Sequence, residues 1–225
     1  MEPNGILLLD KPKNLNSFKL VSILRRLTGV EKIGHAGTLD PFASGVMVML
    51  IGRAYTRLSD QFLNQDKEYR ATLHLGMETD SYDCEGKILK ESSLIPTREE
   101  IEKAVSQFQG TFLQTPPMFS AKKVKGKKLY ELARKGITIE RQPVSVTAYI
   151  SILSYHYPFL EINVSCSKGT YVRSLAHDIG AVLGTGAHLK DLVRLRSGPY
   201  TLAKCIPLET VQSKDFNLNF ALLTF

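Results

Sequence analysis

A glycine-rich segment, GHAGTLDPFASG at residues 34–45, holds the first side chains that could do chemistry. Its three glycines let the backbone approach a ligand closely. Asp40 precedes Pro41, which biases the Asp40 backbone away from the helical region, and its carboxylate could be catalytic. An aspartate here more commonly forms an Asx turn or a helix N-cap, and a histidine such as His35 is more often packed or satisfied within its loop than catalytic. On these residues alone, both interpretations stay open.

A second segment, CSKGTYVRSL at residues 166–175, runs from the end of an expected strand into an expected helix. Lys168 and Arg173 could bind a phosphate or a carboxylate there. The alternative is an ordinary capped helix with exposed cations. Tyr69, on a segment that alternates like a strand, would by itself indicate only a core aromatic.

Several common chemistries lack their motifs. The chain has no GxxxxGK[ST] phosphate-binding loop. A dinucleotide-binding fingerprint follows a strand, whereas the GTG at residues 184–186 follows an expected helix. The histidines form no HExxH, and the HxE with PCxxC of zinc deaminases is missing. Cys84, Cys166 and Cys205 lie far apart, which indicates a reducing compartment rather than a disulfide scaffold or a zinc site.

The charge of the chain is concentrated in one stretch. Its 225 residues include 29 Lys and Arg against 22 Asp and Glu, a net charge of +7. Residues 115–147 carry 8 basic and 2 acidic residues, and Lys122, Lys123 and Lys125 are interleaved there with aromatics. This pattern fits a polyanion such as nucleic acid, although a solvated lysine-rich loop has the same composition. No apolar run reaches the length of a membrane span, and no signal peptide is recognisable.

The elements that must position these residues follow from apolar spacing. Strands are expected at 5–10, 46–52, 67–77 and in a hairpin of 144–153 and 159–166, and helices at 17–29, 97–110, 170–183 and 187–194. The first helix is expected to begin with Ser17 as its N-cap and to carry Phe18, Val21, Leu24 and Leu27 as its apolar stripe.

Strands and helices mix without a strict βαβ alternation. Thr97 and Glu100 form a capping box at the start of one helix, and a turn with Pro158 joins the hairpin. The order of elements predicts an α+β fold, a mixed and largely antiparallel central sheet flanked by helices.

Four long segments, taken in order, resemble the TruB family of tRNA pseudouridine synthases. They are GHAGTLDPFASGVM, KEYRATLHLGMETDSYDCEG, PPMFSAKKVKGKKLYELARKG and SCSKGTYVRSLAHDIG. The opening GILLLDKP resembles the first motif of that family. The resemblance extends from about Gly5 to about Pro207, nearly the whole chain.

The resemblance implies an isomerase that flips uridine 55 out of the T loop of tRNA and converts it to pseudouridine. Asp40 matches the catalytic aspartate, and Tyr69 matches the tyrosine that stacks on the target base. Arg173 matches the arginine that pairs with the catalytic carboxylate. Whether Asp40 attacks ribose C1′ or removes a proton from C2′ stays open, and Tyr69 is a candidate base for the final proton transfer.

The same resemblance implies residues that bind the RNA. His35 matches the histidine that fills the space left by the flipped base, Tyr171 is a neighbour of Arg173 in its motif, and Leu192 matches an apolar residue lining the base pocket. The basic stretch with Lys122, Lys123 and Lys125 resembles an RNA-gripping insertion. No redox cofactor is implied, because the reaction adds and removes nothing. No metal is implied either, because positioned donors can stabilise the negative charge of the departing base.

The expected organisation is one catalytic domain, residues 1–225, with the basic insertion at about 115–147. Only about 18 residues follow Pro207, so the C-terminal PUA domain of many relatives is expected to be missing. We expect a cytoplasmic monomer that binds the T arm of tRNA. The alternatives are a non-catalytic RNA-binding or RNA-chaperone module, which would not require a carboxylate at its centre, and a synthase for a different RNA.

Overall fold

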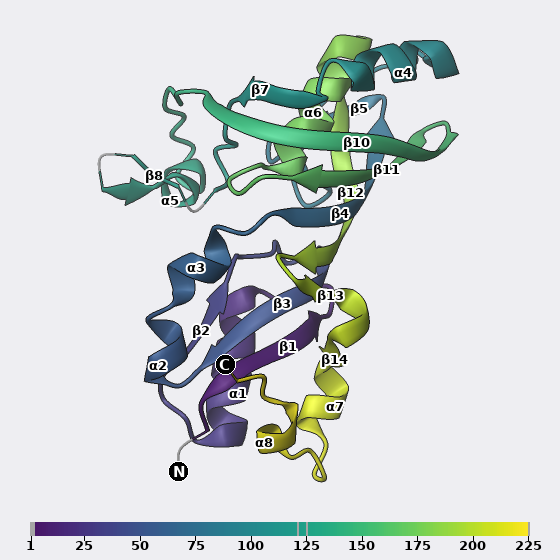
Figure 1. Ribbon diagram of the computed structural model, residues 1–225. Helices are drawn as coiled ribbons and strands as arrows, with labels where there is room; N and C mark the ends of the chain where they lie inside the picture. The colour runs from purple at the N-terminus through teal and green to yellow at the C-terminus, as the bar shows by residue number, and fades with distance from the viewer. Residues whose placement is uncertain (1–2, 121, 125, 225) are drawn as a thin grey trace. The chain divides into compact units, whose positions relative to one another are not determined.

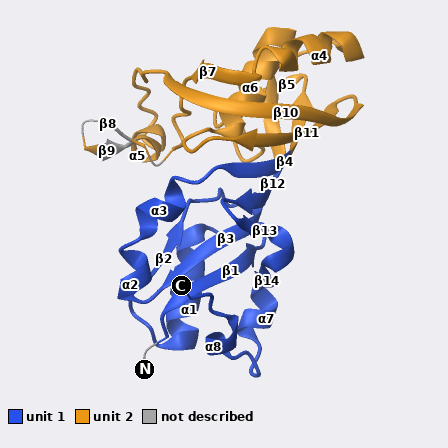
Figure 2. Ribbon diagram, viewed as in Figure 1, with its two compact units in different colours: residues 1–70, 192–225 blue, residues 71–191 orange. Residues whose placement is uncertain are grey.

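The computed structural model describes residues 3–120, 122–124 and 126–224. The chain forms two compact units, which Figure 2 shows in different colours: residues 1–70 with 192–225, and residues 71–191. It passes between them within β4 (Lys67–Leu75) and within β12 (Ala187–Ser197). We refer to them as unit 1 and unit 2.

Unit 1 is built on sheet strands that surround β3 (Figure 1). β1 (Gly5–Lys11) pairs antiparallel with β3 (Ser44–Ile51), and β2 (Ile33–Ala36) also pairs antiparallel with β3. β12 pairs parallel with β3, and β14 (Ile206–Pro207) pairs parallel with β1. β13 (Tyr200–Thr201) closes a turn back onto β12. Every residue of β3 after Ser44 is buried, as its continuous apolar sequence predicts.

The first helix, α1, spans Ser17–Thr28. Its N-cap is Asn16 rather than the predicted Ser17, because the Asn16 side chain accepts a hydrogen bond from the Lys19 amide. The helix ends at Gly29, as predicted, and the structure shows this glycine in the left-handed conformation, at φ 70°. The predicted apolar stripe is only half right: Val21 and Leu24 are buried with Leu20 and Ile23, whereas Phe18 and Leu27 are exposed.

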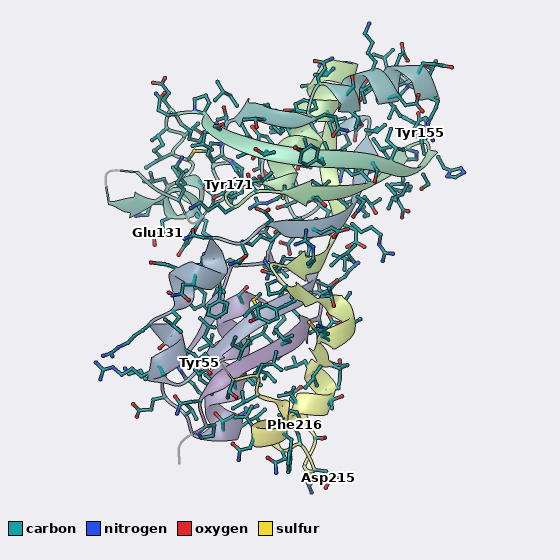
Figure 3. All side chains as sticks on the ribbon, in the orientation of Figure 1. Tyr55, Glu131, Tyr155, Tyr171, Asp215 and Phe216 are labelled. Atoms are coloured by element: carbon teal, nitrogen blue, oxygen red, sulfur yellow. The ribbon has the colours of Figure 1, made fainter. Side chains whose placement is uncertain are left out.

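The core of unit 1 lies along β1, β2 and β3 and is closed by aromatic side chains. Tyr55, labelled in Figure 3, and Phe62 pack with Ile6, Val46 and Val48 in this core. Short helices complete the unit: α2 (Arg53–Thr56), α3 (Ser59–Leu63), a 3-10 helix (Leu202–Lys204), α7 (Leu208–Gln212) and α8 (Leu218–Ala221).

Unit 2 contains the long hairpin that the sequence predicts. β10 (Val144–His156) pairs antiparallel with β11 (Phe159–Cys166) on one side and with β7 (Gly110–Gln114) on the other. The strand order continues from β11 to β4, where Ala71, Leu73 and Leu75 alternate into the core. The remaining elements are β5 (Met77–Thr79), β6 (Ile88–Glu91), β8 (Lys123–Val124), β9 (Lys127–Lys128), α4 (Arg98–Ser106), α5 (Leu129–Ala133) and α6 (Val172–Leu183).

Two helices of unit 2 confirm their sequence signals. The capping box of Thr97 and Glu100 forms at the start of α4. α6 lies behind β10 in the view of Figure 1 and ends at Gly184, in the left-handed conformation. Gly180 inside α6 has a packing reason, because a Cβ there would lie 2.3 Å from the Ala187 amide nitrogen. The helix can therefore approach β12 only with glycine at this position.

The helix predicted at residues 187–194 is wrong, because this segment belongs to strand β12. The buried positions Leu192 and Arg194 alternate as in a strand, but one of them is an arginine. Because a charged residue takes the place of a buried apolar one, the alternation typical of a strand is hidden in the sequence. Lys190 and Arg194, four residues apart, instead have the spacing of a polar helix face. β1–β14 and β3–β12 pair parallel, whereas β1–β3, β2–β3, β7–β10, β10–β11 and β12–β13 pair antiparallel. The structure thus confirms the predicted α+β fold with a largely antiparallel sheet.

Candidate active site

Asp40 lies in unit 1 on the loop of residues 37–43, which joins β2 to β3. Its side chain is partly exposed, while its neighbours Leu39 and Phe42 are buried, at 3% and 5% exposure. Burial of the flanking apolar side chains fixes the loop, while Asp40 itself keeps part of its surface open to solvent. Within this loop the Ala43 amide donates to the Asp40 carbonyl, at 3.2 Å.

Ser17 anchors the backbone directly before Asp40. Its hydroxyl accepts a hydrogen bond from the Leu39 amide, at 3.1 Å, and donates to the Leu39 carbonyl, at 3.2 Å. Ser17 is 1% exposed, so both interactions are shielded from water. Because backbone polar groups that lose a buried partner are costly, this hydroxyl holds Leu39 in one position.

Lys11 anchors the backbone directly after Asp40. It is fully buried, and its ammonium donates to the carbonyls of Leu15 at 2.6 Å, Pro12 at 2.9 Å and Pro41 at 3.2 Å. The Pro41 carbonyl also accepts from the Asn14 amide, at 2.7 Å. Three carbonyl oxygens thus solvate a buried cation that would otherwise be expensive to bury.

Arg194 anchors the start of the loop. Its guanidinium, buried at 1% exposure, donates through Nε to the Val46 carbonyl at 2.7 Å and through Nη2 to the Gly37 carbonyl at 3.2 Å. Gly45 makes the approach of β12 possible, because a Cβ at its φ of +105° would lie 2.3 Å from the Arg194 carbonyl oxygen. Lys11, Ser17 and Arg194, which we call the loop anchors, therefore hold the carbonyls of residues 41, 39 and 37.

His35 lies on β2, not in the glycine-rich loop as predicted. Its Nδ1 is buried and has no hydrogen-bond partner among the described residues. Burial, and secondarily the charge of Arg194, lower the pKa of His35 below its usual value. Its ring meets Phe18 edge to face, with centroids 5.7 Å apart and planes at 84°. A neutral imidazole is the form that this environment favours.

Two further predicted residues lie in unit 1 on the strands that continue into unit 2. Tyr69 is half-buried on β4, and Leu192 is 5% exposed on β12. Both belong to the same unit as Asp40 and His35. Four of the predicted site residues are thus carried by unit 1.

Arg173 lies in unit 2, in the first turn of α6, and is 5% exposed. Its guanidinium forms an ion pair with Asp83 at 3.4 Å and donates to the carbonyls of Ser81 at 3.2 Å and Phe119 at 2.7 Å. The Asp83 carboxylate also accepts from the Ser81 hydroxyl at 2.5 Å. Asp83 was not predicted as a site residue, although it lies in the quoted segment KEYRATLHLGMETDSYDCEG; the only available signal was its place in that segment.

The turn that carries Asp83 is clamped to α6 a second time. Tyr82 adopts φ 65°, a conformation that non-glycine residues seldom take, and its ring stacks on His177 with centroids 3.9 Å apart. His177 lies four residues after Arg173, on the same face of α6. The turn and the helix therefore meet at two points, one helical turn apart.

Tyr171 is half-buried and forms the N-cap position of α6, and it is labelled in Figure 3. Its amide donates to the side-chain oxygen of Gln114 at 2.8 Å, and its carbonyl accepts from the same side chain at 3.1 Å. Because Gln114 is fully buried on β7, this pair of bonds fixes the backbone just before Arg173.

The basic stretch forms the β8–β9 hairpin followed by α5. Lys122 is half-buried, and its carbonyl accepts from the Leu129 amide at 2.9 Å. Lys123 has a described backbone only, and Lys125 lies outside the described residues. Arg134 lies over the ring of Tyr130, 5.5 Å from its centroid, so this part of unit 2 does interleave cations with aromatics.

No group of three or more His, Cys, Asp or Glu side chains is arranged to hold a metal ion among the described residues. No described helix is long and apolar enough to cross a membrane.

Known proteins are similar to this chain over most of its length. A family model described as TruB family pseudouridylate synthase (N terminal domain) matches residues 25–172, and one described as tRNA pseudouridylate synthase B C-terminal domain matches residues 173–218. A tRNA pseudouridine synthase B from Protochlamydia amoebophila is 60% identical, over 95% of this chain and 83% of its own. That from Chlamydia abortus is 58% identical, over 96% and 92%.

Solved structures are similar over most of this chain but are longer. A chain in the crystal structure of a Cbf5-Nop10-Gar1 complex superimposes with a TM-score of 0.74 at 28% identity, over 96% of this chain and 58% of that one. A chain of an H/ACA RNP bound to a substrate RNA containing 2′-deoxyuridine gives 0.69 at 26% identity, over 96% and 57%. This chain thus spans little more than half of those solved chains. The matched family models and the curated relatives together show that the chain belongs to the TruB family of pseudouridylate synthases.

Proposed function

We propose that this protein is an isomerase that converts uridine to pseudouridine at position 55 in the T loop of tRNA, with Asp40 as its catalytic carboxylate. The observation that carries the proposal is the Asp40 loop, whose backbone is held on both sides by buried side chains in a chain of this family. A reaction centre needs such a preorganised carboxylate. A module that only binds RNA would gain nothing from an acid that repels phosphate.

The reaction breaks the bond between uracil N1 and ribose C1′ and forms a bond between C5 and C1′. N1 gains a proton and C5 loses one, so atoms and electrons balance without a redox cofactor. An ionised Asp40 can either attack C1′ or remove the C2′ proton, and both routes place the carboxylate against the sugar. Lys11 on β1 and Arg194 on β12 are both buried and hold the backbone on either side of Asp40.

We further propose that Arg173 is a catalytic residue whose guanidinium stabilises negative charge during the reaction. Support comes from the environment of Arg173, since a guanidinium at 5% exposure, positioned by Asp83 and two carbonyls, has little freedom to swing into solvent. A desolvated and oriented guanidinium is an effective partner for negative charge.

Base flipping would use the apolar residues of the site. Extruding a nucleotide costs about a few kcal/mol, which stacking on Tyr69 and packing against Leu192 would offset. His35, neutral because burial lowers its pKa, would fill the space that the base leaves. Tyr69 is also a candidate for removing the C5 proton.

Recognition of the T arm would rest on shape and phosphate contacts. Lys122, Lys123 and Lys125 of the basic stretch would supply cations, and Tyr171 would line the approach to Arg173. We place this activity in the cytoplasm, with the chain acting as a monomer and as one catalytic domain.

The test is position-resolved mapping of pseudouridine in unmodified tRNA. The wild-type chain should modify position 55, and Asp40→Asn should lower kcat by about 10⁴-fold while tRNA binding persists. Asp60→Asn is the matched control, because Asp60 is an exposed aspartate of α3 in the same unit. Modification at another position, or an active Asp40→Asn, would overturn the proposal.

A further inference from the structure

Phe18 is a large apolar side chain that the fold of α1 does not use. It is 69% exposed, whereas Leu20 and Leu24 on the same helix are fully buried. The core-facing side of α1 is therefore already filled without it. Single exposed apolar residues are common, so exposure alone assigns no role to Phe18.

The position of Phe18 is unusually well fixed for an exposed residue. It follows Ser17, whose hydroxyl is bonded to both backbone groups of Leu39, the residue before Asp40. The cap by Asn16 fixes the same helical turn. Edge-to-face contact with His35, at 5.7 Å, sets the orientation of the ring while leaving most of its surface open.

The charge around Phe18 suits a polyanion. Lys13 and Lys19 are both exposed on either side of it in the sequence, and the first turn of α1 contains no acidic residue. An exposed aromatic ring between cations is the combination that unpaired nucleic acid recognises, since bases stack on the ring and phosphates meet the cations. The lysines by themselves would be equally consistent with an ordinary solvated surface, but that interpretation assigns no function to the exposed phenyl ring.

We propose that Phe18 is a stacking platform for an unpaired nucleobase of the RNA substrate, adjacent to the nucleotide on which Asp40 acts. This inference rests on the proposed function, because it presumes that RNA reaches the Asp40 loop. The ligand class is a single-stranded or extruded base, recognised by its π face rather than by its sequence.

A single tryptophan tests the contact directly, because the wild-type chain contains none. In Phe18→Trp, unmodified tRNA should quench the indole emission, since a stacked base lies against the ring. Leu27→Trp is the matched control: it lies in the last turn of the same helix, 44% exposed, and should respond weakly. Equal responses from the two variants would overturn the proposal.

Kinetics give an independent measurement. Phe18→Ala should weaken tRNA binding and raise KM by about 5- to 100-fold, the usual effect of losing one base stack. Phe18→Tyr should restore both, and Leu27→Ala should change neither. The salt dependence of binding should keep its slope in Phe18→Ala, because stacking releases no counterions. A flattened slope would instead identify a phosphate contact and contradict the stacking role.

The two proposals fail in different ways. If the wild-type chain forms pseudouridine at position 55 but Phe18→Ala binds and turns over tRNA normally, stacking is refuted and the proposed function stands. If the wild-type chain forms no pseudouridine, the proposed function is refuted. Quenching of Phe18→Trp by tRNA would still support the aromatic contact in that case, and absence of quenching would refute it.

Discussion

Asp83 is the carboxylate on which the buried charge of Arg173 depends, and its replacement by asparagine is the sharpest perturbation of unit 2. The side chains of the pair are 6% and 7% exposed, with Nη1 and Oδ2 3.4 Å apart. Asparagine keeps the shape and can keep the oxygen that accepts from Ser81 and from the Glu85 amide. It removes the negative charge and turns an amide donor toward a guanidinium that can only donate.

The magnitude follows from this geometry. Removing one partner of a buried ion pair lowers the free energy of unfolding by about 3–5 kcal/mol. Because asparagine has nearly the same shape as aspartate, Asp83→Asn should lie near the lower limit. That is a large part of the roughly 5–15 kcal/mol of a typical domain. The exposed pair of Arg98 and Glu102, at 51% and 54%, is the control, and Glu102→Gln should cost about 0.3–0.5 kcal/mol.

The assay is a double-mutant cycle in urea, followed by circular dichroism and by pseudouridine formation. Arg173→Met alone should be about as destabilising as Asp83→Asn, because it leaves a carboxylate buried without its cation. The double variant should be more stable than the sum of the two losses predicts, by at least about 2 kcal/mol. Its activity should stay low, since stability returns without the guanidinium.

Two results would refute this reasoning. If Asp83→Asn costs no more than Glu102→Gln, the buried pair does not contribute as its geometry indicates. If the double variant is fully active, Arg173 has no part in the chemistry.

Two further predictions concern Ser17 and His188. Ser17→Ala removes the buried partner of the Leu39 amide and carbonyl, so it should lower the free energy of unfolding by about 2 kcal/mol and change kcat more than KM. Ser22 is exposed on the same helix, so Ser22→Ala should leave urea unfolding and kcat unchanged. An equal effect of both variants would contradict the anchor role of Ser17. Burial lowers the pKa of His188 below its usual value of 6.5. On acidification the imidazole is therefore protonated in the unfolded chain before it is protonated in the folded one, and the free energy of unfolding should fall as pH drops below 6.5. His188→Gln should flatten that fall in urea titrations between pH 7 and 5 and the exposed His156→Gln should not; identical curves would show that His188 is not the cause.

Local signals in the sequence predicted much of the fold. Apolar runs identified β1 and β3, alternation identified β4, and the capping box of Thr97 and Glu100 marked the start of α4. These features depend on residues close in sequence, which is why they could be read directly. The prediction for β12 was wrong because Arg194 is a charged residue in the core. Its burial depends on hydrogen bonds to the distant carbonyls of Val46 and Gly37, which the local sequence does not reveal.

The residues of the candidate site likewise differ in whether the sequence could predict them. Asp40 and Arg173 could be named from their motifs, but the side chains that hold them could not. Lys11 and Ser17 act on backbone carbonyls and amides, and such partners leave no mark in the spacing of side chains. Ser17 even carried a misleading signal, since serine at a helix start is typical of an N-cap. Only the three-dimensional course of the chain shows that its hydroxyl reaches residue 39.

The difference between the two anchoring schemes decides how each carboxylate should be tested. The loop anchors bind the backbone of residues 37, 39 and 41, so replacing the Asp40 side chain leaves Lys11, Ser17 and Arg194 with the same partners. Loss of activity in Asp40→Asn with unchanged unfolding in urea would therefore be assigned to chemistry. Asp83 is different, because its carboxylate is itself the anchor, and its replacement changes stability and activity together. For that residue only the coupling with Arg173 separates the two effects.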